Sequence, residues 1–84
     1  MRVIFGETAW EEYIHWQLAN PKLSAKINTL LTECLRTPFQ GTGKPEPLRE
    51  DLKGWWSRRI DQEHRLVYQP TKEGLLIAKC RSHY

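Results

Sequence analysis

The fold is decided by the stretch GWWSRRIDQEHRLVYQPTKEGLLIAKCR, residues 54–81, in which apolar and polar side chains alternate. Alternation with a period of two is typical of β-strands. It predicts three strands, at Trp55–Ile60, Arg65–Gln69 and Leu75–Arg81. The segments between the strands are short and polar, and the second of them ends at Gly74. Because short turns join antiparallel neighbours, we expect an antiparallel meander.

The clearest helix lies upstream of these strands. Asn20 suits the N-cap and Pro21 suits the first turn, where no amide donor is needed. The helix is expected to end before Thr37 and Pro38, because the residue before a proline avoids the helical region. Apolar residues recur between these limits at helical spacing. They are Leu23, Ile27, Leu30, Leu31, Cys34 and Leu35.

Another helix is predicted before it, and a strand before that. Thr8 and Glu11 match a capping box, in which each side chain accepts a hydrogen bond from the other's backbone amide. The β-prone run at residues 2–5 is ended by Gly6 and forms a strand that can join the sheet. One side of the helix carries Trp10, Tyr13, Ile14, Gln17 and Leu18.

This order of elements predicts an α+β fold. An N-terminal strand and a two-helix hairpin would pack on an antiparallel sheet. The chain of 84 residues is short enough that we expect a single domain spanning residues 1–84.

Positive charge gathers in the C-terminal part of the chain. Residues 1–35 carry three Lys or Arg against four Asp or Glu, whereas residues 36–84 carry ten against six. Balances of −1 and +4 therefore make up the net charge of +3. Such asymmetry is expected of a protein that binds a phosphate backbone, although it is also common on surfaces that bind no nucleic acid.

The cysteines and the N-terminus exclude several classes of protein. Cys34 and Cys80 are too few for a disulfide framework and lack metal-ligand spacing, so we expect two small buried hydrophobes, no metal site and no cofactor. Residues 1–10 form neither a signal peptide nor a membrane span. We therefore expect a cytoplasmic protein with no membrane partner.

Residues 37–53, TPFQGTGKPEPLREDLK, hold three prolines and two glycines and show no helical period. Long irregular loops in small domains are usually functional. Pro45 and Pro47 hold the backbone of Glu46 extended, which presents its carboxylate at low entropic cost. The alternative is a solvated glutamate that pairs with a nearby Lys or Arg.

Alternation also sorts the strand residues into two faces. Ser57 and Arg59 share a face with Trp55, whereas Arg58 lies opposite with Trp56. In the last strand the predicted core side comprises Leu76, Ala78 and Cys80. The other side comprises Ile77, Lys79, Arg81 and His83. With Arg59 and Arg65, this second set predicts a cationic face that opens onto the loop.

A glutamate, a histidine and several arginines on one face are the groups that metal-free RNA cleavage needs. A general base takes the 2′-hydroxyl proton, guanidinium groups stabilise the charge at phosphorus, and an acid protonates the leaving 5′ oxygen. Glu46, Arg65 and His83 are the candidates. Taken singly, a histidine near a chain end, such as His83, is usually an incidental surface group. We interpret His15, on a polar flank of its helix, and His64, in a turn, as incidental surface groups too.

The sequence also resembles a known family along its whole length. The segments KPEPL, WSRRI, EHRLVY and the final HY are similar to those of the YoeB toxins, which belong to the RelE/ParE superfamily. This resemblance implies a RelE-like, microbial ribonuclease-type fold. It also implies the toxin of a type II toxin–antitoxin system, a ribosome-dependent mRNA endonuclease (an mRNA interferase) that inhibits translation.

The resemblance implies a role for each matching residue. Glu46 matches the general base, Arg65 the phosphate-stabilising arginine and His83 the general acid, and Tyr84 matches a terminal residue that orients the substrate base. Arg49 stands where a basic residue, often lysine, is expected. The residues expected to bind RNA phosphates are Lys44, Arg49, Arg59, Lys79 and Arg81.

The implied partners are a YefM-type antitoxin, the ribosome with its mRNA, and a second copy of the chain in a homodimer. Operator DNA would be bound only through the antitoxin complex. Two other functions agree with the same residues: an RNA- or ribosome-binding module without catalysis, and a module that captures an acidic protein partner.

Overall fold

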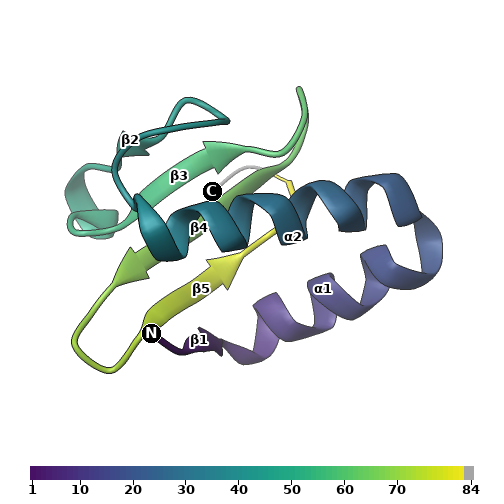
Figure 1. Cartoon of the computed structure of the whole chain (residues 1–84), viewed down its shortest axis with the longest axis horizontal. Coiled ribbons are helices and arrows are strands. Elements are labelled where there is room, and N and C mark those ends of the chain that lie inside the picture. Colours follow the sequence, from purple (N-terminus) through teal and green to yellow (C-terminus); the bar gives the residue numbers. More distant parts are fainter. Residues whose placement is uncertain (83–84) are drawn as a thin grey trace.

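The computed structural model describes residues 1–82 and confirms the α+β fold (Figure 1). Helices α1 (Glu7–Ala19) and α2 (Pro21–Arg36) are joined at Asn20 and pack on one face of a five-stranded sheet. The strand order is β1-β5-β4-β3-β2. The strands are β1 (Val3–Phe5), β2 (Glu46–Pro47), β3 (Trp56–Arg59), β4 (Arg65–Pro70) and β5 (Leu75–Lys79).

The predicted meander is present as β3, β4 and β5, with successive strands antiparallel. The N-terminal strand β1 joins the sheet beside β5 and runs parallel to it, with Val3 opposite Leu75 and Phe5 opposite Ile77. A parallel pair requires a long crossover, and here both helices and three strands lie between the two partners in sequence. The remaining strand, β2, forms within the proline-rich loop, where the sequence predicts no regular structure.

Helix α2 agrees with the prediction in its limits and in its buried face. The Asn20 side chain accepts a hydrogen bond from the backbone N–H of Leu23 at 3.1 Å, and Pro21 occupies the first turn. The helix ends at Arg36, directly before Thr37. Its buried residues are Leu23, Ser24, Ile27, Leu30, Leu31 and Cys34. They form one core with the inner face of the sheet, which contributes Ile60, Leu66, Tyr68, Leu75, Ile77 and Cys80.

Helix α1 begins differently from the sequence prediction. The predicted capping box is wrong, because the helix begins at Glu7 with Gly6 as its N-cap and no side-chain cap. The buried residues of α1 are Ala9 and Trp16. On the side that carries Trp10, Tyr13 and Leu18, Tyr13 packs against the core, whereas Trp10 and Leu18 are exposed. Neither helix within residues 1–82 is long and apolar enough to cross a membrane.

The predicted core side of the last strand is also wrong in part. The register between β4 and β5 shifts, because Val67 pairs with Lys79 whereas the next residue, Tyr68, pairs with Ile77. Ala78 is therefore an extra residue, as in a β-bulge, and the alternation changes phase there. Ile77 is consequently buried together with Cys80, although simple alternation places them on opposite faces.

Candidate functional site

One row of residues crosses four strands of the sheet. Glu46 of β2 is paired with Ser57 of β3, Ser57 with Val67 of β4, and Val67 with Lys79 of β5. Directly opposed residues of antiparallel strands project from the same face. Arg59 and Arg65 are paired one step further along β3 and β4 on this face. The outer face of the sheet thus brings an anion and three cations of the predicted site together.

Glu46 of β2 and Arg65 of β4 are in contact across the intervening strand β3. Oε1 of Glu46 lies 3.2 Å from Nη1 of Arg65, which also donates to Oγ of Ser57 at 3.3 Å. The Glu46 side chain is 51% exposed, whereas that of Arg65 is 16% exposed. The carboxylate therefore remains accessible to a ligand, while the guanidinium is held by the sheet.

Two cations of this face, Arg59 and Arg65, line a shallow hollow of about 510 Å³. Lys44, Arg59 and Arg65 lie on its wall, joined by Lys26 of α2. Four guanidinium and ammonium groups from different segments can thus meet an anion of several oxygens. A second hollow of about 470 Å³ is lined by Glu46 and Arg49. Five of the residues expected to act on RNA, Lys44, Glu46, Arg49, Arg59 and Arg65, therefore line one or the other of two hollows.

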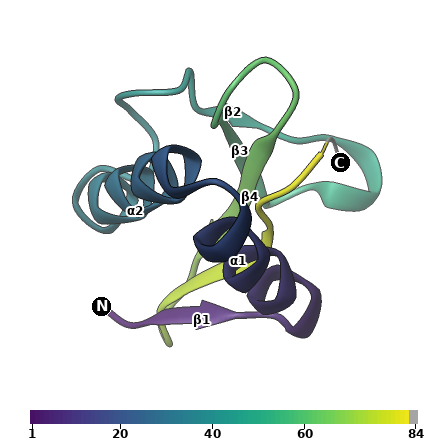
Figure 2. The same cartoon turned by 90° about the vertical axis from the view of Figure 1, so that its right-hand side faces the viewer.

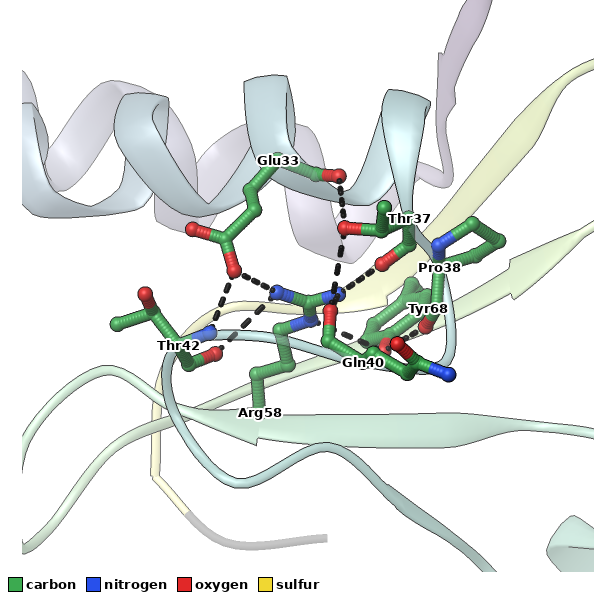
Figure 3. Close-up of polar contacts among 7 residues, drawn as sticks. All are labelled: Glu33, Thr37, Pro38, Gln40, Thr42, Arg58 and Tyr68. Carbon is green, nitrogen blue, oxygen red and sulfur yellow. Dashed lines mark hydrogen bonds and ion pairs between the residues drawn. The ribbon is translucent and has the colours of Figure 1, made fainter.

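The loop that carries Glu46 is held from beneath by Arg58, whose side chain is fully buried (Figure 3). Its guanidinium donates to the carbonyls of Thr37, Gln40 and Thr42 and forms a 2.8 Å ion pair with Glu33. Nε donates to the hydroxyl of Tyr68 at 3.1 Å. One arginine therefore ties residues 37–42 to both the helix layer and the sheet.

The pKa values of two partners of Arg58, Glu33 and Tyr68, differ from their ordinary values. Hydrogen bonds from the backbone and side chain of Thr42, together with Arg58, hold the pKa of the Glu33 carboxyl below its usual value. Burial raises the pKa of the Tyr68 hydroxyl to about 12, so this group stays protonated and donates to the carbonyl of Pro38 at 2.6 Å.

Shortly before β2 begins, the backbone of the loop lies close to the backbone of β3. The backbone N–H of Arg59 donates to the carbonyl of Gly43 at 2.7 Å. Gly43 has a φ of 87°, and a Cβ there would lie 2.9 Å from the carbonyl oxygen of Arg59. Glycine is therefore required where the loop joins the edge of β3. In Figure 2, α2 lies on one side of the sheet and the segment after β2, with its short helix Glu50–Leu52, extends to the other.

The segment after β5 is held by α1. Nε1 of Trp16 donates to the carbonyl of Cys80 at 2.8 Å, and the N–H of Cys80 donates to the Glu12 carboxylate at 2.9 Å. The guanidinium of Arg81 lies 5.6 Å from the centroid of the Trp16 ring, which places this cation against α1 and not on the wall of the hollow. The expected acid His83 and its neighbour Tyr84 lie outside the described residues.

Sequence reasoning missed Arg58 and Ser57 as parts of the site. Arg58 was detectable, because alternation placed it on the inner face with Trp56, where a cation needs several acceptors. Ser57 gave no such signal, since its contact with Arg65 depends on the pairing of two strands. Both cysteines are buried, as expected, and no group of three metal-binding side chains occurs among residues 1–82.

Comparisons with known proteins identify the family. A family model described as a YoeB-like toxin of bacterial type II toxin–antitoxin systems matches residues 5–84. The toxin YoeB of Escherichia coli K12 is 52% identical over the full length of both chains. The structure of a YoeB/ParE toxin from Agrobacterium tumefaciens is 44% identical and covers all of both chains with a TM-score of 0.96.

Two structures from Staphylococcus aureus are also similar. One is a YoeB dimer, 41% identical with a TM-score of 0.93, and the other is a YoeB–YefM complex, 42% identical with a TM-score of 0.92. Each match covers all of this chain and 98% of the other. The chain described here belongs to the YoeB family of toxins of bacterial type II toxin–antitoxin systems.

Proposed function

We propose that this toxin is a ribosome-dependent mRNA endonuclease that inhibits translation by cutting mRNA without a metal ion. Residues 1–84 would act as one domain. The observation that carries the proposal is the contact between the exposed Glu46 carboxylate and the Arg65 guanidinium at the edge of a cationic hollow. Membership of a toxin family supports it, and a cationic surface beside the accessible Glu46 carboxylate suits attack on a phosphodiester.

The proposed chemistry assigns one task to each group. Glu46 accepts the proton of the ribose 2′-hydroxyl, and the resulting oxygen attacks the adjacent phosphorus. Arg65 stabilises the negative charge that builds on the phosphoryl oxygens, and Lys44 and Arg59 hold the neighbouring phosphates. His83 then protonates the 5′ oxygen as its bond to phosphorus breaks, which leaves a 2′,3′-cyclic phosphate, and Tyr84 orients the base. Arg49, Lys79 and Arg81 would contact more distant phosphates.

Cleavage of mRNA on purified ribosomes tests this proposal. Glu46→Gln removes the base but keeps an oxygen that can accept from Arg65, so binding should persist while single-turnover cleavage falls about 100-fold or more. Lys72→Gln is the matched control, because this exposed residue lies in the turn after β4, at the far end of the strand from Arg65. Intact mRNA on ribosomes that have bound the wild-type protein would favour a binding module without catalysis.

The proposed partners follow from the relatives. The S. aureus structures contain a YoeB dimer and a YoeB–YefM complex. We therefore propose a homodimer and a YefM-type antitoxin, with operator DNA bound only through the complex, in the cytoplasm. An acidic antitoxin segment would neutralise the cationic hollow and block ribosome and mRNA. Co-purification of an acidic protein that abolishes cleavage would support this.

A further inference from the structure

His64 holds the last described residue of the chain. Nδ1 of His64 accepts a hydrogen bond from the backbone N–H of Ser82 at 2.8 Å. The imidazole is buried, and its ring lies edge-on against Trp16 with the centroids 4.7 Å apart. His64 is placed in turn by the Asp61 carboxylate, which accepts from the N–H groups of Glu63 and His64 at 2.8 and 2.7 Å.

The direction of the hydrogen bond from Ser82 shows which imidazole nitrogen of His64 carries a proton. An imidazole nitrogen that accepts a hydrogen bond carries no proton, so Nδ1 is unprotonated and the neutral ring has its proton on Nε2. Nε2 lies 3.7 Å from the exposed carboxylate of Glu63. Within residues 1–82 the two nitrogens therefore have separate partners, and Nδ1 is the one that contacts Ser82.

Ser82 is also bonded to the site itself. Its carbonyl accepts from the backbone N–H of Arg65 at 3.1 Å, while the side chain of the same arginine reaches Glu46. Ser82 has a φ of 62°, a conformation that residues other than glycine rarely adopt without support. Both polar backbone groups of Ser82 are thus held by two consecutive residues, His64 and Arg65.

We propose that His64 is a positioning residue, whose unprotonated Nδ1 fixes the backbone of Ser82 and hence the point from which His83 and Tyr84 continue. The inference rests on the proposed function, because His64 would affect cleavage through the acid step that is assigned to His83. Without the acceptor, the backbone of Ser82 is held by its one bond to Arg65 and is less tightly fixed.

Four variants test the inference through the position of the acceptor. His64→Asn retains an oxygen near the place of Nδ1, His64→Gln places its oxygen one bond further out, and His64→Phe keeps a ring against Trp16 but has no acceptor. Glu63→Gln is the matched control, because it changes only the partner of Nε2. Hydrogen exchange of the Ser82 amide and single-turnover cleavage of ribosome-bound mRNA are measured for each.

We expect the Ser82 amide of His64→Phe and His64→Gln to exchange at least about tenfold faster than in the wild type, and that of His64→Asn and Glu63→Gln to stay near it. The cleavage rate of the first pair should fall on the order of 10- to 100-fold with unchanged affinity for ribosomes. If His64→Phe does not fold, the comparison of Asn with Gln decides. Equal Ser82 exchange or equal cleavage for Asn and Gln would overturn the inference, whereas a wild-type protein that cuts no mRNA would overturn the proposed function and leave the exchange result standing.

Discussion

Nη1 of Arg65 lies 3.2 Å from Oε1 of Glu46, although the two residues are 19 positions apart and belong to strands that do not pair with each other. Strand β3 lies between them and contributes Ser57, which accepts from the same nitrogen. The contact therefore exists only because the loop closes onto the edge of the meander. It joins a proposed base and a proposed phosphate-binding group in one unit.

Because the Glu46 side of this ion pair is half exposed, the pair should matter for chemistry more than for stability. Glu46→Gln and Arg65→Lys are each expected to change the free energy of unfolding by less than about 1 kcal/mol. Both should reduce cleavage of ribosome-bound mRNA about 100-fold or more. Urea unfolding and single-turnover cleavage measure the two effects. A loss of activity that merely follows a loss of folded protein would contradict the prediction.

Arg58 should show the reverse pattern. Arg58→Met leaves three loop carbonyls and Glu33 without their donor and is expected to destabilise the fold by about 3 kcal/mol. Arg59→Met, its exposed neighbour, should change stability by less than about 0.5 kcal/mol. Urea unfolding of the two variants provides the comparison. Equal midpoints would show that the buried network does not support the loop.

The cations of the hollow should make the affinity for ribosomes depend on salt concentration. Replacing Lys44 or Arg59 by alanine removes one proposed phosphate contact, so the slope of log affinity for programmed ribosomes against log salt should become shallower by about 0.7 to 0.9. Lys72→Ala, in the distant turn, should leave the slope unchanged. Binding measured at several salt concentrations tests this. A uniform weakening with the original slope would place these residues outside the phosphate contacts.

The two thiols should be unreactive in the folded protein. Burial raises the pKa of Cys34 to about 11 and that of Cys80 to about 12, so little thiolate forms at neutral pH. Alkylation by iodoacetamide at about pH 8 should be at least 100-fold slower in the native protein than in guanidinium. Mass spectrometry of the labelled protein gives both rates. Rapid native labelling of either cysteine would show that its surroundings open readily.

Glu33 should contribute to stability in a pH-dependent way. Its pKa in the folded protein lies below the ordinary value of 4.5, so the folded state favours the ionised form. The contribution is therefore fully present above pH 4.5 and is lost as the pH falls through the lower, folded value. Glu33→Gln lacks this term. Urea unfolding should show a difference between wild type and variant that is largest near neutral pH and shrinks in acid.

The elements that sequence predicted best are those whose signal is local. The apolar spacing of α2 and its Asn20–Pro21 start gave both limits and the buried face of that helix. The capping box at Thr8 failed because the N-cap is Gly6, two residues earlier, so Thr8 lies within the first turn of the helix. The face of β5 failed at Ala78, because a bulge depends on the partner strand and has no signature within the strand itself.

The candidate site divides in the same way. Glu46 between two prolines and the charge of β3 and β4 could be identified from composition and order alone, and the roles proposed for them are those that the resemblance to the YoeB toxins implies. The contacts of His64 with Ser82 and Trp16 could not be identified, since the sequence shows only a histidine in a polar turn.

By itself the sequence determined the kinds of elements, the family and the charge that the C-terminal half carries, because periodicity, turn residues and composition act over a few positions. Only the tertiary structure decided which charges meet. The pairing of β2 with β3 brings Glu46 to Arg65. The buried guanidinium of Arg58 donates to carbonyls of the loop and so supports it. The bulge at Ala78 changes the alternation of β5, so that Ile77 and Cys80 are both buried. These contacts join residues far apart in the chain, and their geometry arises only when the sheet and the helices close on one core.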